Sequence, residues 1–285
     1  MIPFEWEEPD SLDAAISILA SGDDTVRPMA GGTALMLMMK AGVFSPSRLV
    51  SLAKIEPRYS EISVSADGSL TIGAMASLSQ LEQSPEVMQH FPVMRRAVRT
   101  LSNVRVRNVA RVGGALAHGD PHMDLPPLLA ALGAVVSVRG PDGPRELAVE
   151  EFYLGYYETV LNRGELIESV RVPPLNGAKA AYTKVTSRSA DDWPAINIGV
   201  RLEMDRDRIR SARIVVSAAT DKVTRLNDVE QMLTGEAPTA QLLEEAGDRA
   251  VREISFLSDA HGSAAYKKEL LRVYLRRAVE EAVHA

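Results

Sequence analysis

Apolar positions in the first 40 residues repeat with a helical period on both sides of a short strand. A predicted helix over 11–20 has one apolar face, which consists of Leu12, Ala15, Ile16 and Leu19. The apolar run 25–30 predicts a strand, and the apolar residues of 33–40 predict a second helix. Gly31 and Gly32 separate these two elements, so the pattern places both glycines at a strand-to-helix turn.

Shorter elements follow, together with one long stretch that lacks a period. The pattern predicts strands over 48–51, 134–139 and 166–172, a hairpin over 59–72, a turn at 141–144, and helices over 77–84, 87–101 and 128–131. The stretch 108–127 is rich in Gly, Pro, Asp and His, which predicts an irregular loop. Loops of this length are usually functional or disordered, and its buried-type residues favour a functional loop.

The last third of the chain places strands before helices. It predicts strands over 180–187, 196–204 and 214–219, and then amphipathic helices over 223–233, 241–251 and 264–282. This order is typical of an α+β layer in which helices cover one face of an antiparallel sheet. Pro173-Pro174 ends the preceding strand and marks the predicted boundary. We expect one domain over 1–175, with subdomains of about 1–57 and 58–175, and a second over 176–285.

Composition narrows the classes of function. The 285 residues are 46% apolar and 25% charged, with a net charge of −6 and no basic stripe for nucleic acid. Because the chain has no cysteine, it cannot form disulfides, use a thiolate or hold an iron–sulfur cluster alone. No run approaches the ~20 apolar residues of a membrane span, and the N-terminus lacks an apolar signal core. We therefore expect a cytoplasmic protein.

His118 and His122 form the only close pair of histidines. Their spacing suits a metal shared across one turn of a helix, but Gly119 and Pro121 disfavour a regular helix between them. No metal site is expected.

The first segment that can carry chemistry is the glycine turn with the residues around it, Ala30, Gly31, Gly32, Thr33, Ala34 and Leu35. Backbone without side chains can approach a phosphate closely, and the start of the following helix favours an anion. Thr33 adds a hydroxyl donor. The alternative is a tight turn with a capping threonine.

The second segment lies about 80 residues further on, over 111–126. It begins with Arg111, Val112, Gly113 and Gly114 and continues through small residues to Asp120 and Asp124. Small residues let a flat ligand lie against the backbone, and Asp124 can accept bonds from ribose hydroxyls. The alternative is a glycine-rich surface loop. Together, the two glycine turns could hold a pyrophosphate, although neither matches a Rossmann or Walker A motif.

The order of these motifs resembles the FAD-binding medium subunit of molybdenum hydroxylases, the family of the carbon-monoxide dehydrogenase medium chain and the xanthine dehydrogenase flavin domain. The similarity runs from about residue 3 to residue 280. The segments that carry it are Ala30-Gly31-Gly32-Thr33, Val106-Arg107-Asn108 before Val112-Gly113-Gly114, Ala117-His118-Gly119-Asp120-Pro121, Asp124-Leu125-Pro126, Glu165-Leu166-Ile167 before Pro173-Pro174, Tyr182-Thr183-Lys184, and Gly262-Ser263-Ala264-Ala265-Tyr266.

The resemblance implies a two-part FAD-binding domain of the vanillyl-alcohol-oxidase type, followed by a C-terminal α+β domain. It further implies that the first loop and Gly113-Gly114 donate N–H groups to the FAD pyrophosphate, while Asp124 binds ribose. The backbone of Leu166 or Ile167 would meet the adenine. His118 and Asp120 belong to the same matching loop, so they are also expected at the cofactor.

Lys184 is implied to lie near the flavin ring, where a cation favours a reduced, anionic ring. Asp191-Asp192-Trp193 matches a segment that packs near the isoalloxazine, so the Trp193 ring would stack there unless it anchors the core. Two departures stand out: Arg111 replaces a threonine, and His122-Met123 replace a small pair. Arg111 would contact phosphate or point to solvent.

The resemblance also implies partners. A molybdopterin large subunit would oxidise the substrate, and an iron–sulfur small subunit with two [2Fe–2S] clusters would pass electrons to FAD and on to NAD, a quinone or O₂. The absence of cysteine here fits clusters on another chain. Two alternatives remain: a stand-alone FAD oxidoreductase that uses His118, Asp191 or Asp192, and a nucleotide-binding assembly protein without catalysis.

Overall fold

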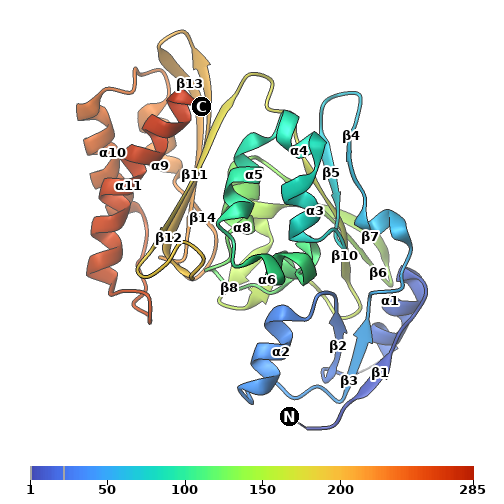
Figure 1. Cartoon of the computed structure of the whole chain (residues 1–285). Coiled ribbons are helices and arrows are strands. Elements are labelled where there is room, and N and C mark those ends of the chain that lie inside the picture. The colour runs from blue at the N-terminus through green and yellow to red at the C-terminus, as the bar shows by residue number, and fades with distance from the viewer. Residues whose placement is uncertain (1, 22) are drawn as a thin grey trace.

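Four β-sheets organise the part of the chain that this computed structural model describes, residues 2–21 and 23–285 (Figure 1). The first sheet is parallel, with strand order β1-β3-β2. Its strands are β1 (Glu5–Glu7), β2 (Val26–Met29) and β3 (Arg48–Ser51), and the accompanying helices are α1 (Leu12–Ser21) and α2 (Thr33–Lys40). The apolar face predicted for the first helix is buried in a small core that includes Val50 and Leu52.

The second sheet is antiparallel, with strand order β4-β5-β10-β6-β7. Its strands are β4 (Ile62–Val64), β5 (Leu70–Gly73), β6 (Val135–Gly140), β7 (Gly143–Ala148) and β10 (Leu166–Val172). The hairpin predicted over 59–72 is confirmed, because β4 pairs with β5. The pattern missed β7, an edge strand whose residues are mostly half-exposed or exposed, so it has no apolar alternation to detect.

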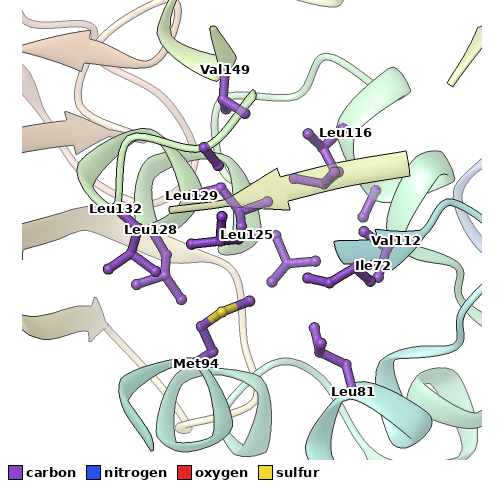
Figure 2. Close-up of a cluster of buried hydrophobic side chains, with 14 of the residues drawn as sticks. Ile72, Leu81, Met94, Val112, Leu116, Leu125, Leu128, Leu129, Leu132 and Val149 are labelled. Atoms are coloured by element: carbon purple, nitrogen blue, oxygen red, sulfur yellow. The ribbon is translucent and has the colours of Figure 1, made fainter. Parts of the chain in front are cut away.

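Helices cover one face of this sheet. They are α3 (Leu78–Gln83), α4 (Pro85–His90), α5 (Pro92–Arg99), α6 (Val104–Val109), α7 (Val112–Ala117) and α8 (Leu125–Ala131). Figure 2 shows Leu125 and Leu129 of α8, Met94 of α5 and Leu116 of α7 pointing into one buried cluster. This cluster is the main core of the molecule.

Two predictions in this region were wrong. The single helix expected over 87–101 is divided into α4 and α5 at Phe91-Pro92, because proline has no amide hydrogen and Phe91 leaves the helical conformation. The stretch 108–127, expected to be one irregular loop, contains α7 and the first turn of α8, and only the part between these helices is irregular. Glycine lowers helix propensity, but tertiary packing of α7 overrides it.

The third sheet is antiparallel, with strand order β11-β12-β13-β14. Its strands are β11 (Lys179–Thr186), β12 (Pro194–Asp205), β13 (Arg208–Ser217) and β14 (Thr224–Arg225), and its helices are α9 (Asn227–Leu233), α10 (Ala240–Glu253) and α11 (Ala264–His284). The helices share a core with one face, which confirms the expected α+β layer. The other face of this sheet packs closely on α8. A Cβ added to Gly199 of β12 would lie only 2.8 Å from the Pro127 carbonyl oxygen of α8.

A small fourth sheet pairs β8 (Tyr153–Gly155) with β9 (Glu158–Thr159), and single 3₁₀ turns form over Pro57–Ser60 and Val149–Glu151. No helix in the described residues is long and apolar enough to cross a bilayer.

Candidate functional site

The fold brings the two glycine segments into contact. A Cβ on Gly31 would lie only 2.1 Å from the carbonyl oxygen of Val109, just before the second segment. A Cβ on Gly114 would lie 3.8 Å from the Cβ of Ala30 in the first. Segments about 80 residues apart in the sequence therefore form one surface. Position 31 must be glycine, because any side chain there would clash with the backbone of Val109.

The first segment supplies the start of α2. Gly32 is its N-cap residue and has a left-handed backbone with φ of 69°, and no side chain caps the helix. The amides of Thr33, Ala34 and Leu35 open the first turn, where an α-helix has no internal acceptor for them. These amides and the helix dipole favour an anion at this end. Thr33 lies inside the helix, so the alternative of a capping threonine is wrong.

The second segment is the first turn of a helix rather than a glycine turn. Val112 and Gly113 are buried, and their amides donate to the carbonyl oxygens of Ala76 at 3.0 Å and Ala74 at 2.8 Å. The Gly113 amide is therefore already bonded within the chain, and its expected bond to a ligand stays a prediction. A Cβ at this position would approach the Ala74 Cβ to 2.7 Å, so this glycine is required by packing. Gly114, in contrast, is exposed beside Ala30.

Arg111 is the N-cap residue of α7 and lies partly buried against the core. Its Nη1 donates to the Met75 carbonyl oxygen at 3.1 Å, whereas its buried Nε has no hydrogen-bond partner among the described residues. Burial lowers the pKa of this guanidinium, which nevertheless stays protonated. The side chain does not point to solvent. It is a partly buried cation in the second glycine segment, and no described carboxylate forms an ion pair with it.

Leu166 and Ile167 begin β10, with buried side chains. The pairing of β10 with β5 starts only at Ser169, so β5 does not cover this end of the strand. Leu166 packs in the same cluster as Ala30, which places the uncovered strand edge beside the first glycine segment.

Asp124 joins the two halves of the molecule. It is buried ahead of α8 and accepts hydrogen bonds from Tyr182 Oη at 2.8 Å and Lys184 Nζ at 3.2 Å, both on β11. Burial raises the pKa of Asp124, and the two donors oppose that effect. Lys184 also donates to the Thr100 carbonyl oxygen at 3.0 Å. A ribose contact at Asp124 would have to share these oxygens, so its role as a ligand stays a prediction.

A second buried network was not predicted. The oxygens of Asp120 accept from Tyr157 Oη at 2.8 Å and lie 2.9 Å from His122 Nδ1, and His122 Nε2 lies 3.0 Å from Asp259, which pairs with Lys267. Burial favours a higher pKa for Asp120, but the bonds from His122 and Tyr157 outweigh it and lower the pKa. The pattern could not reveal this network, because His122 and Asp259 are 137 positions apart.

Aromatic rings gather over this network. The His118 ring packs edge-on against Tyr157 with centroids 5.1 Å apart, and burial lowers the pKa of His118. Trp193 is 40% exposed and lies edge-on to His122 at 6.2 Å. Trp193 is therefore not a core anchor, and much of its ring remains accessible.

Comparison with known proteins identifies the family of the chain. Residues 2–175 match the family described as "FAD binding domain in molybdopterin dehydrogenase", and residues 180–282 match the family described as "CO dehydrogenase flavoprotein C-terminal domain". The chain therefore belongs to the FAD-binding medium-subunit family of molybdenum hydroxylases.

Individual relatives cover the whole chain. The glyceraldehyde dehydrogenase medium chain of Sulfolobus acidocaldarius is 29% identical over 98% of both chains. The nicotine 6-hydroxylase medium subunit of Paenarthrobacter nicotinovorans is 31% identical over 97% of this chain and 96% of its own. The structure of carbon monoxide dehydrogenase from Hydrogenophaga pseudoflava aligns with a TM-score of 0.95 and 30% identity, over 100% of this chain and 99% of that one.

Proposed function

We propose that this chain holds FAD where the two glycine segments meet and serves as the flavin subunit of a heteromeric molybdenum hydroxylase. FAD, when bound, supplies the redox chemistry, and the protein supplies binding, orientation and electrostatics. The observation that carries the proposal is the close approach of Ala30 and Gly114, which joins the two glycine segments. Arg111 of the second segment has a buried Nε without a hydrogen-bond partner among the described residues.

Each part of this surface suits a different part of a dinucleotide. The first-turn amides of Thr33, Ala34 and Leu35 and the guanidinium of Arg111 would bind the pyrophosphate by charge-assisted hydrogen bonds. Gly114 would leave room for the phosphates, while Gly113 maintains the packing behind it. The uncovered backbone of Leu166 and Ile167 would meet the adenine.

The other end of the cofactor would lie toward β11 and the segment that follows it. Lys184 would contribute a positive charge there, partly neutralised by Asp124. The exposed ring of Trp193 would stack on the flavin, and the neutral His118 and the Asp120 network would hold the neighbouring loop. No step in this role requires a catalytic acid, base or nucleophile from the chain.

The partners follow from the same role. The chain has no cysteine, so iron–sulfur clusters that deliver electrons would lie on a small subunit, and the molybdenum cofactor on a large subunit. The external acceptor would be NAD, a quinone or O₂. The relatives differ in the substrates that their names state, which is consistent with a substrate pocket on another chain.

The test is to purify the chain together with the proteins encoded beside it. We expect bound flavin together with molybdenum and iron in the purified complex, and substrate-dependent flavin reduction only when all chains are present. Turnover of a substrate by this chain alone would favour a stand-alone flavoenzyme. A colourless chain that takes up no FAD on titration would favour the assembly protein.

A further inference from the structure

A groove of ≈ 480 Å³ lies between helix α5 and strand β11, which stand side by side in Figure 1. Its helical wall is a single stripe of α5, formed by Val93, Arg96 and Ala97 and continued by the C-cap residue Thr100. Its other wall is β11 from Tyr182 to Thr186, followed by the loop that contains Arg188. The site proposed for FAD uses only Lys184 among these residues.

The strand wall is the open edge of a sheet. Within the described residues β11 pairs only with β12, so alternate N–H and C=O groups along its eight residues have no strand partner on the outer side. Such an edge is a template for an added strand. The eight residues of α5 span ~12 Å, which matches about four residues of an extended chain.

The groove is also positively charged in an acidic protein. Arg96 and Arg188 line it, are exposed, and form no ion pair in the described part of the chain, whereas the single acidic residue of the lining is Glu281. The whole chain carries a net charge of −6, and many of its other arginines lie against a carboxylate, as the exposed Arg210 does against Glu203. Two unpaired cations beside a strand edge therefore fit an acidic occupant.

We propose that this groove binds an extended acidic segment of a partner chain, which adds to β11 as a further strand while its carboxylates pair with Arg96 and Arg188. Main-chain bonds to the strand edge would hold the segment, and the arginines would select it by charge. This inference rests on the proposed function, which requires partner chains. A small anion, the other possible occupant, would pair with the arginines but would form no main-chain hydrogen bonds along the edge of β11.

The absence of cysteine makes the groove easy to probe, because Thr183→Cys introduces a single thiol among the residues that line it. The probe is a synthetic peptide of alternating glutamate and valine, added to the full-length chain while alkylation of the thiol is followed. We expect saturating peptide to slow alkylation at least about tenfold, since strand addition covers the thiol. Thr186→Cys serves if the first variant does not fold, and Gln241→Cys on α10 is the control that the peptide should not protect.

Two matched controls separate strand addition from charge alone. The same peptide with alternate backbone nitrogens methylated keeps its charge but loses its donors, and it should not protect the thiol. Arg96→Glu with Arg188→Glu should abolish protection, whereas Lys222→Glu with Arg252→Glu, an equal change of charge outside the groove, should not. Equal protection by the methylated peptide or by pyrophosphate would overturn the proposal, as would no protection by the peptide.

Reactivity of the same thiol in the assembled complex is the second test. There the thiol should be protected without added peptide, and Arg96→Lys should give a carbodiimide cross-link to a carboxylate of a partner chain. A complex that contains flavin, molybdenum and iron but leaves the thiol fully reactive would overturn the groove while leaving the proposed function intact. If no partner co-purifies, the proposed function fails, and the peptide experiment still decides the groove.

Discussion

Arg111 shows how one residue changes the chemistry of the glycine surface. A guanidinium lies at this position, and its buried Nε has no hydrogen-bond partner within the described part of the chain. An unpaired buried donor costs free energy, so a ligand that supplies the acceptor recovers part of that cost.

We therefore expect Arg111→Met to weaken FAD binding by about tenfold, or ~1.4 kcal/mol, because a charge-assisted bond is lost. Isothermal titration calorimetry, in which FAD is added to the FAD-free chain, measures this change in affinity. Arg105→Met, an exposed position on the neighbouring helix, should leave the affinity unaltered. An equal loss in both variants would contradict a specific contact.

The two glycines of α7 should respond differently to substitution. Gly114→Val adds a side chain on the exposed side, where only Ala30 lies within 4 Å, so the chain should fold normally but lose FAD. Gly113→Val places its side chain against Ala74 and should lower the melting temperature itself. Flavin absorbance and circular dichroism of the purified variants distinguish these outcomes. Normal flavin content in a folded Gly114→Val chain would remove this surface from the site.

Among the elements, the loop between α7 and α8 is held to the start of α11 by a charged chain. Asp120, His122, Asp259 and Lys267 link in order, and the side chains of His122 and Lys267 are almost fully buried. Such a link positions the loop that carries His118 and Asp120. It also makes the position of the loop sensitive to acid.

Asp120 determines the sign of that sensitivity. Its pKa is lowered from the ordinary 3.8, so its contribution to stability is complete above that value and is lost as the pH falls through the folded pKa. We expect wild type to lose more unfolding free energy than Asp120→Asn as the pH is lowered from 5 to about 2. Urea denaturation across this pH range gives the difference in unfolding free energy between the two proteins. Asp124 is present in both, so its opposite effect on stability cancels in this difference. Parallel pH curves for the two proteins would show that Asp120 contributes nothing.

At the scale of the whole molecule, the two halves share more than a linker. The main core includes Ala180 and Val215 of the C-terminal sheet, and the buried pair of Asp124 and Lys184 connects α8 with β11. The two halves should therefore unfold together, and the pair of Asp124 and Lys184 should contribute to the stability of both.

We expect Asp124→Asn and Lys184→Met to destabilise the chain by about 3–5 kcal/mol each, because each leaves a buried charge without its partner. The double variant should regain much of this loss. Chemical denaturation of all four proteins completes the double-mutant cycle. Strictly additive losses would indicate that the two groups do not interact.

The strands and helices with a strong apolar period were predictable from the sequence. The predicted boundaries of α2, β3 and β10 agree with the structure to the residue. The period is absent where helices are short, so α7 and the N-terminal turns of α8 were expected to be loop. The glycines themselves were identified, but the pattern could not show that Gly113 is buried against Ala74 while its neighbour Gly114 is exposed.

The sequence by itself determined the α+β class of the C-terminal layer, the glycine segments and the family, because these depend on local pattern and on the order of motifs along the chain. Only the tertiary structure decided which glycine is exposed beside Ala30, where Arg111 lies, and that Asp120 and Asp124 are bonded inside the protein. The reason is physical: hydrogen bonds and close approaches join residues far apart in the sequence, such as His122 and Asp259 at a separation of 137 positions, and a local pattern does not contain that information.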